Sequence, residues 1–360
     1  MRGGLQVADN IMLVDVTKRF GEVTAVDRLN LEIKQGECFS FLGPSGCGKT
    51  TTLRMLAGFE DLDEGEMYVG DTLVSSSSKR YYLPSEKRGF GMVFQAFAVW
   101  PHMSVYENVA FPLRVKKLQH DEVDRRTREA LANTRLAGLE KSYPGELSGG
   151  QQQRIALARA IALNPRVLLL DEPLSNLDPH NRETMRFEIK DLQRKLGVTI
   201  VFVTHDQSEA MALSDRMLVM KEGVVQQVDT PVNIYYNPAN RFVFSFIGLS
   251  NFIPAEASGG KVYVKGATEE GILAETKDAD LSKFKSGEAV AAFRPSDIVL
   301  EEDGRLSGIV TRRTFLGELV DYKIKVGKYD IRLQKNRGGL QVPEGKPCKM
   351  GLRRIIWYES

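Results

Sequence analysis

The residues from 43 to 50 have the types and spacing of a loop that binds phosphate. Their sequence, Gly43-Pro44-Ser45-Gly46-Cys47-Gly48-Lys49-Thr50, fits the P-loop pattern Gly-x-x-x-x-Gly-Lys-[Ser/Thr]. Glycines allow consecutive backbone N–H groups to turn toward an anion, and a helix N-terminus adds the positive end of its dipole. Lys49 is expected to contact the β- and γ-phosphates, and the Thr50 hydroxyl to bind Mg2+. The loop predicts that the chain binds a nucleoside triphosphate.

The segments on both sides of this loop are those that phosphate binding requires. Cys38–Leu42 is a short apolar run, which predicts a buried strand. Residues 51–57 have the composition of a helix, and Gly58 is placed to end it. Because strand, glycine-rich loop and helix follow one another, an accidental match to the pattern is disfavoured.

Two further strands are expected to end in polar groups at one sheet edge. Val167–Leu170 is fully apolar, typical of a parallel strand buried on both faces, and it leads into Asp171 and Glu172. Thr199–Thr204 is a similar run followed by His205. Since ligands bind beyond the carboxyl ends of such strands, we interpret Asp171 as a Mg2+ ligand, Glu172 as a general base and His205 as a γ-phosphate contact. Two helix-capping acids and a structural histidine are the alternatives.

Gln95 and Phe20 are each open to two interpretations. Gln95 follows the strand-like run Gly91–Phe94, where its amide could reach the metal and a water molecule, but a single glutamine is commonly just a surface residue. Phe20 lies beside a turn, where its ring could stack on an adenine or pack in the core. The residues alone leave Phe20 undecided.

A second stretch also has the chemistry of an anion site. Ser148-Gly149-Gly150-Gln151 precedes a helix expected over residues 152–162, so its backbone N–H groups could bind a phosphate. This stretch carries no lysine of the P-loop kind. Two phosphate-type sites with one lysine-bearing loop do not fit a simple kinase.

Length and composition narrow the class of protein. The chain has 360 residues, enough for one large and one smaller domain. Its formal net charge of +2 is too small to create a positive electrostatic field that attracts nucleic acid, so nucleic acid is not expected as a partner. Three cysteines without metal-ligand spacing suit a reducing compartment. With no signal peptide and no apolar run of about 18 residues, we expect an intracellular protein that needs a partner to work at a membrane.

The remaining sequence suggests how the chain is divided. Residues 105–137 have a charged, helical pattern, and Ser75–Arg80 is interpreted as a short flexible insertion. From Ile253 onward, short alternating segments bounded by turns predict a small antiparallel barrel. The domain boundary is expected within residues 235–247. Residues 1–10 look like an irregular leader, and their hexapeptide Arg-Gly-Gly-Leu-Gln-Val recurs at residues 337–342 without a physical explanation.

These motifs together resemble those of one family, the ATPase subunits of ATP-binding-cassette (ABC) importers. Leu-Ser-Gly-Gly-Gln at residues 147–151 is the most specific mark, and the likeness covers the first domain nearly end to end. The resemblance implies an α/β P-loop NTPase fold. It places an ABC nucleotide-binding domain at residues 11–240, with a helical subdomain at about 97–160, and implies ATP and Mg2+ as cofactors.

The resemblance also implies a role for each motif. It makes Phe20 the adenine-stacking aromatic, Gln95 the Q-loop glutamine and His205 the H-loop histidine. The catalytic residues are then Glu172, His205 and Gln95, and the metal ligands Thr50, Gln95 and Asp171. Contacts to nucleotide are implied for Phe20, Gly43, Pro44, Ser45, Gly46, Cys47, Gly48, Lys49, Thr50, Thr51, Ser148, Gly149, Gly150, Gln151 and Asp178, the last in the D-loop between two ATP sites.

In this family two subunits pack head to tail, so Ser148, Gly150 and Gln151 of one copy would cover the ATP on the P-loop of the other. The implied partners are a second copy of the chain, integral membrane permease subunits and, indirectly, a solute-binding protein. Phe97, Trp100 and Met103 are expected to line the groove that grips a permease helix. The implied location is the cytoplasmic face of the membrane, as a peripheral subunit.

The second domain, residues 241–360, is similar to the OB-like/TOBE regulatory domain of maltose, polyamine and iron(III) importer ATPases. Phe246-Ile247-Gly248 and Arg294-Pro295-Ser296-Asp297 carry this looser likeness. Residues 99–103 and the serine-rich insertion favour iron(III) or polyamine as cargo, with a sugar as the alternative. A soluble cassette ATPase with a regulatory role is a second alternative, disfavoured because the chain has one cassette and no sustained heptads.

Overall fold

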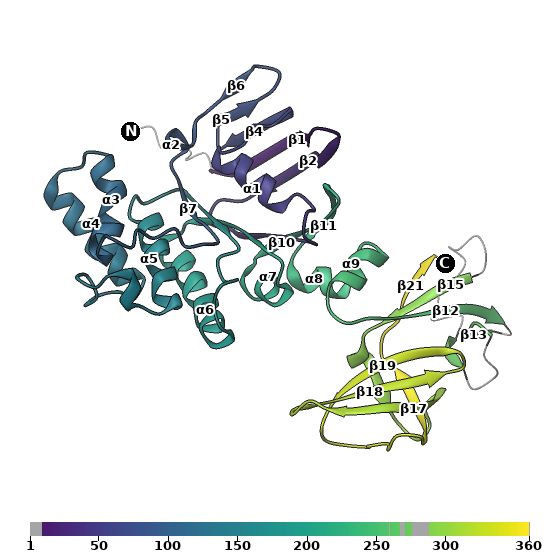
Figure 1. Cartoon of the computed structure of the whole chain (residues 1–360). Helices are drawn as coiled ribbons and strands as arrows, with labels where there is room; N and C mark the ends of the chain where they lie inside the picture. The colour runs from purple at the N-terminus through teal and green to yellow at the C-terminus, as the bar shows by residue number, and fades with distance from the viewer. Residues whose placement is uncertain (1–8, 259, 267–270, 276–287, 360) are drawn as a thin grey trace, which may run out of the picture. The chain divides into compact units, whose positions relative to one another are not determined.

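The computed structural model describes residues 9–258, 260–266, 271–275 and 288–359 (Figure 1). The chain divides into two compact units, Met1–Asn237 and Pro238–Ser360. This division falls at residue 237, where the sequence suggested 240, and lies within the expected range. Most of the expected leader, including the first copy of the hexapeptide, lies outside the described residues.

A mostly parallel sheet forms the centre of the first unit. Its order is β11-β10-β3-β9-β8-β7, with β11 the one antiparallel strand. The strands are β3 (Cys38–Leu42), β7 (Phe90–Val93), β8 (Val167–Asp171), β9 (Thr199–Thr204), β10 (Arg216–Lys221) and β11 (Val224–Asp229). The predicted strands at Cys38–Leu42 and Thr199–Thr204 are therefore confirmed. Since β3, β8 and β9 are parallel neighbours, their carboxyl ends meet at one edge.

A second, antiparallel sheet lies over helix α1 (Lys49–Ala57), which Figure 1 shows between the two sheets. Its order is β2-β1-β4-β5-β6. The strands are β1 (Ile11–Phe20), β2 (Val23–Ile33), β4 (Glu64–Val69), β5 (Thr72–Ser76) and β6 (Tyr81–Tyr82). The interpretation of Ser75–Arg80 as a flexible insertion is wrong at its start, because Ser75 and Ser76 are buried in β5. Their hydroxyls donate to Asp61 and Glu66, which satisfies them away from water.

The apolar run of β8 is buried on both faces, as predicted. Val167 and Leu169 pack into the core shared with α1 and the antiparallel sheet. Leu168 and Leu170 pack into the core formed by the helices on the other side. Alternate side chains of a strand point to opposite faces, so a strand covered on both sides must be apolar throughout.

The helices on that other side include those expected from the charged pattern. They are α3 (Val105–Val115), α4 (His120–Asn133), η1 (Pro144–Glu146), α5 (Gly149–Ile161), α6 (Pro179–Leu196) and α7 (Gln207–Leu213), while α2 (Ser85–Arg88) and α8 (Pro231–Tyr236) lie elsewhere in the unit. Helix α5 begins at Gly149, three residues before the predicted start at residue 152, because Ser148 caps it. No helix within the described residues has both the length and the apolar character to cross a membrane.

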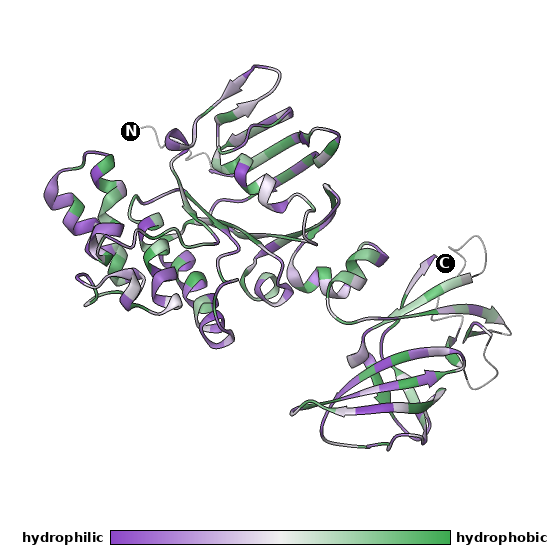
Figure 2. Cartoon of the chain, viewed as in Figure 1, coloured by the Kyte–Doolittle hydropathy of each residue, from purple (hydrophilic) through white to green (hydrophobic). Residues whose placement is uncertain are grey.

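The second unit is built from antiparallel strands around its own core. After α9 (Arg241–Phe246), two five-stranded sheets have the orders β14-β13-β12-β15-β21 and β16-β20-β17-β18-β19. The strands are β12 (Asn251–Ser258), β13 (Lys261–Val264), β14 (Ile272–Glu275), β15 (Glu288–Phe293), β16 (Ile298–Leu300), β17 (Leu306–Phe315), β18 (Leu319–Val326), β19 (Tyr329–Asn336), β20 (Pro347–Leu352) and β21 (Ile356–Glu359), with η3 (Pro295–Asp297) before β16. Figure 2 shows the alternation of hydrophobic and hydrophilic residues along β18, where every second side chain is buried. Apart from α9 and η3, the elements described in this unit are strands, which agrees with the predicted fold class.

Candidate active site

The P-loop connects the end of β3 to the start of α1 and holds Lys49 in a folded-back position. The Lys49 ammonium donates to the carbonyl oxygens of Gly43 at 2.7 Å and Pro44 at 2.8 Å, and lies 3.7 Å from the Cys47 sulfur. No side chain caps α1 at its N-terminus. The loop therefore presents backbone N–H groups without intrahelical partners beside a positive charge, which is the chemistry of an anion site.

Two glycines of the loop are required by close contacts, and one of them, Gly48, also by its backbone conformation. Gly48 has φ of 104°, and a Cβ placed there would lie 2.2 Å from the carbonyl oxygen of Ala25. A Cβ at Gly43 would lie 2.3 Å from the carbonyl oxygen of Met220. The backbones of strands β2 and β10 thus lie so close to the loop that only glycine, which has no Cβ, fits at these two positions.

Asp171, at the end of β8, lies next to the P-loop threonine. The Thr50 hydroxyl donates to the Asp171 carboxylate at 3.4 Å. Burial raises the pKa of Asp171, against the lowering effect of Arg54, because the partly buried carboxylate has lost water. A hydroxyl and a desolvated carboxylate at this position are oxygen ligands of the kind that Mg2+ prefers. The alternative of a helix-capping pair is wrong, since α6 begins at Pro179 with Asp178 as its cap.

Glu172 joins two other predicted residues. Its carboxylate accepts a hydrogen bond of 2.9 Å from the Gln95 amide and lies 3.2 Å from Nδ1 of His205. Its backbone N–H donates to Val203 on β9, and its φ of 45° is unusual for a residue other than glycine. The three side chains come from the ends of β7, β8 and β9, so neighbouring parallel strands bring them together.

Asn176 lies two residues before Asp178, in the D-loop that the resemblance implied; it was not predicted as a site residue, but it contacts this cluster. Its side-chain amide donates to the Gln95 carbonyl oxygen at 2.7 Å, so Gln95 is held by both its side chain and its backbone. The signal in the sequence was weak, because asparagine is common in loops for reasons unrelated to ligands.

Phe20 lies at the end of β1 with 49% of its surface exposed, so the core alternative is wrong. The Lys18 ammonium is 5.3 Å from the centre of its ring. An exposed ring beside a cation can stack on a flat ligand.

The second stretch with the chemistry of an anion site begins at Ser148, which is exposed and caps the helix that follows it, α5. The Ser148 hydroxyl accepts from the Gln151 backbone N–H, and the Gln151 side chain accepts from the Ser148 N–H at 2.9 Å. Asp178 similarly caps α6 and accepts from the Asn181 N–H at 3.0 Å. Within the described part of the chain, no hydrogen bond or ion pair joins Ser148 or Gln151 to the P-loop.

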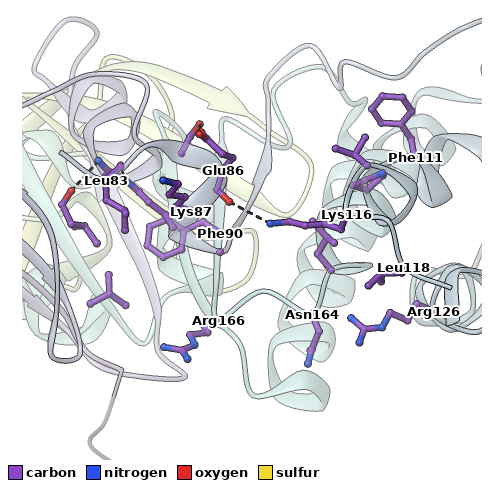
Figure 3. Close-up of a pocket in the computed structure, with 18 of the residues that line it drawn as sticks. Leu83, Glu86, Lys87, Phe90, Phe111, Lys116, Leu118, Arg126, Asn164 and Arg166 are labelled. Atoms are coloured by element: carbon purple, nitrogen blue, oxygen red, sulfur yellow. Dashed lines mark hydrogen bonds between the residues drawn. The ribbon is translucent and has the colours of Figure 1, made fainter.

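A groove of about 850 Å³ opens between α3 and the segment from Leu83 to Phe90 (Figure 3). Trp100 lines it as expected, but Phe97 does not, because its side chain is buried in the core with 8% exposed. Met103 is half-buried and does not line the groove. The apolar wall is supplied instead by Phe111, Pro112 and Val115 of α3, which sequence reasoning missed. In Figure 3, Lys116 reaches across to the Glu86 carbonyl oxygen.

Comparison with known proteins identifies the family. The ABC transporter family model matches residues 26–175, which include the P-loop, Ser148-Gly149-Gly150-Gln151 and the paired acids. The chain is 46% identical over 88% of its length to the spermidine/putrescine import ATP-binding protein of Rubrobacter xylanophilus, of which it covers 83%. The chain belongs to the ABC transporter family. It is an ABC ATPase of the import type, as the resemblance implied.

Two other relatives have different cargo in their names. The ABC ATPase is 54% identical over 68% of its length to the trehalose/maltose import ATP-binding protein of Thermococcus litoralis, covering 66% of that protein. It is 40% identical over 91% of its length to the Fe(3+) ions import ATP-binding protein of Vibrio cholerae, covering 90% of it.

Solved structures agree on the fold of the first unit. A dimeric ATP-binding cassette in a post-hydrolysis state, bound to ADP and Pi, matches with a TM-score of 0.53 and 34% identity, over 61% of this ABC ATPase and 98% of that chain. A subunit of the cbiONQ transporter from Clostridium perfringens matches with a TM-score of 0.57 and 30% identity, over 62% of this ABC ATPase and 89% of that chain.

Proposed function

We propose that two copies of this ABC ATPase close around two ATP molecules and drive solute uptake through membrane permease subunits. The observation that carries this proposal is the separation of the two anion-binding elements. The P-loop, Asp171, Glu172, Gln95 and His205 are within one cluster, whereas Ser148 and Gln151 lie exposed and bonded to each other. A second copy would supply the missing cover to each P-loop.

Within one half-site, each side chain has a distinct task. The P-loop N–H groups and Lys49 bind the phosphates once Lys49 leaves the Gly43 and Pro44 carbonyl oxygens. Phe20 stacks on the adenine. Glu172 accepts the proton of the attacking water, and His205 holds the γ-phosphate and orients Glu172 through their 3.2 Å contact.

Thr50, Asp171 and Gln95 are the residues that would hold Mg2+, which neutralises charge on the phosphates when bound. Their hydroxyl, carboxylate and amide oxygens fit this hard cation. Within the described residues, no group of three His, Cys, Asp or Glu side chains is arranged to hold a metal ion, and the proposed site is this mixed set together with phosphate oxygens.

Complementation between two defective chains tests the shared site. Lys49→Ala removes the phosphate charge of the P-loop, and Ser148→Arg blocks the second anion stretch. Each variant alone should hydrolyse ATP at a few per cent of the parent rate or less, while an equimolar mixture should regain about a quarter, because half of the dimers are mixed and have one intact composite site. A mixture no more active than its components would contradict the shared site.

The groove beside α3 is proposed to receive a helix of the permease. Trp100 and Phe111, with ring centres 4.5 Å apart, form an aromatic floor of the kind that anchors a partner helix. Phe111→Asp should abolish co-purification with the permease without changing ATP binding by the free chain. The ATPase would then be peripheral on the cytoplasmic face of the membrane, and a solute-binding protein would act through the permease.

The cargo is proposed to be iron(III) or a polyamine, with a sugar as the alternative. Relatives named for polyamines and iron(III) align over 86% or more of the chain, including its second unit, whereas the trehalose/maltose relative aligns over 68%. The second unit is proposed to be regulatory. Uptake of spermidine, iron(III) and trehalose by cells with and without the intact transporter would distinguish the three.

A further inference from the structure

The five residues after Gln95 connect the active site to the groove. At one end, Gln95 is held by Glu172 and Asn176. At the other end, the Trp100 N–H donates to the buried Asn108 of α3 at 2.8 Å, and Asn108 donates back to the Trp100 carbonyl oxygen at 3.1 Å. The connection is therefore anchored at both ends, and any shift of one end must be absorbed or transmitted by the residues between.

Those residues have a backbone that requires support. Phe97 and Ala98 have φ of 58° and 50°, two consecutive residues other than glycine in the left-handed region. Such conformations are sparsely populated and persist only where the surroundings hold them. Burial of the Phe97 side chain in the helical core provides one constraint.

Arg159, on the half-buried side of α5, provides the second constraint. Its guanidinium donates to the Ala98 carbonyl oxygen at 2.6 Å and to the Phe97 carbonyl oxygen at 3.1 Å. The same guanidinium lies 4.6 Å from the centre of the Trp100 ring. Its planar shape allows two hydrogen bonds in the plane and an aromatic contact on the face, which lysine cannot reproduce. Arg159 thus touches both strained residues and the groove.

We infer that Arg159 is a positioning residue, which holds the segment from Gln95 to Trp100 in the conformation that places the Gln95 side chain in the active site. Its helix α5 begins at Gly149, directly after the cap Ser148, so the helix that supports the Gln95 segment also follows the stretch proposed to cover the ATP of a second copy. The inference rests on the proposed function, because it assumes that Gln95 contributes to Mg2+ binding.

Kinetics of Arg159→Lys and Arg159→Ala in the full chain test the positioning role. We expect kcat to fall about tenfold or more and half-saturating Mg2+ to rise about tenfold, with the KM for ATP within about twofold of the parent. Arg154→Ala is the matched control: Arg154 is on the same helix and pairs with Glu188 at 2.7 Å, without contact to the Gln95 segment. It should leave kcat and the Mg2+ dependence unchanged.

A spectroscopic readout separates positioning from general stability without Mg2+ or turnover. The sequence has two tryptophans, Trp100 and Trp357, so Trp357→Phe leaves Trp100 as the single emitter. In that background we expect ATP alone to change Trp100 emission, and Arg159→Ala to abolish the change and increase acrylamide quenching about twofold. Arg159→Lys serves the same test where the alanine variant does not fold.

Three results would overturn the inference. One is Arg159 variants that match Arg154→Ala in kcat and Mg2+ dependence. The second is a variant in which ATP affinity and Mg2+ affinity fall by the same factor while the melting temperature also falls, which is the behaviour of a merely structural residue. The third is a Trp100 response to ATP that is the same with and without Arg159. If the parent chain itself hydrolyses no ATP, or Glu172→Gln hydrolyses it normally, the proposed function has failed, and the two failures are distinguishable.

Discussion

Replacement of Glu172 by glutamine removes a carboxylate with little change in shape. Glutamine keeps the length of the side chain and one oxygen, so a hydrogen bond from Gln95 can remain. It also tolerates φ of 45° no worse than glutamate, whereas glycine would relax the backbone. The substitution therefore isolates the basic oxygen that faces His205 at 3.2 Å.

The expected effect is confined to the chemical step. Removal of a positioned general base lowers kcat about 10²- to 10⁴-fold, which corresponds to about 3–5 kcal/mol in the barrier. ATP affinity should change by less than about twofold, because the P-loop and Lys49, rather than Glu172, contact the phosphates. Loss of the charge beside Asp171 also lowers the pKa of Asp171 toward its ordinary value, since Glu172 is one of the groups that raise it.

The assay combines steady-state phosphate release with nucleotide binding and size-exclusion chromatography. The variant should bind ATP, hydrolyse it at a hundredth of the parent rate or less, and accumulate as an ATP-dependent dimer. Glu188→Gln is the matched control, because Glu188 is also a partly buried carboxylate, paired with Arg154, and lies outside the cluster. Its kcat should stay within about twofold of the parent.

A kcat within about fivefold of the parent would refute the assignment of Glu172 as base, because no other change in the site would compensate so fully. Loss of ATP binding together with turnover would instead show that Glu172 supports the fold of the loop. A slow variant that stays monomeric with ATP would agree with Glu172 as the base but would contradict the ATP site shared by two copies.

Two further substitutions test the electrostatics and the packing. Asp171→Asn should raise the melting temperature of the nucleotide-free chain at pH 7 and abolish stabilisation by Mg2+. The folded-state pKa of Asp171 is raised above its ordinary value of 3.8, so the stability that Asp171 contributes is fully present below pH 3.8 and is lost as the pH rises through the folded-state pKa. The difference in melting temperature between variant and parent should therefore vanish in acid. Arg88→Met should lower unfolding free energy by about 3 kcal/mol in urea titrations, since the buried guanidinium donates to the carbonyl oxygens of Met55 and Leu56 at 2.6 and 2.8 Å and to that of Leu83 at 2.7 Å. Arg128→Met, on the exposed face of α4, is the control and should leave the unfolding free energy unchanged, because a surface ion pair adds little to stability.

Features set by neighbouring residues were predictable from the sequence. The helix after the P-loop and its Gly58 cap, and the buried strands before Gly43 and before Asp171, depend on patterns within about ten residues and match the structure. Features set by distant contacts were not. Ser75 and Ser76 looked like a flexible tract, but their burial depends on Asp61 and Glu66 from other segments.

The sequence by itself determined the chemistry of this protein, because a P-loop, a strand ending in Asp171 and Glu172, and the Ser148 stretch are each local patterns with local reasons. The tertiary structure decided which of these groups meet. Only the parallel order of β7, β8 and β9 brings Gln95 and His205 to the Glu172 carboxylate. Only packing shows that Phe97 is core rather than groove and that Arg159 supports its strained backbone. A side chain's direction and its distant partner depend on the whole fold, which no window of sequence contains.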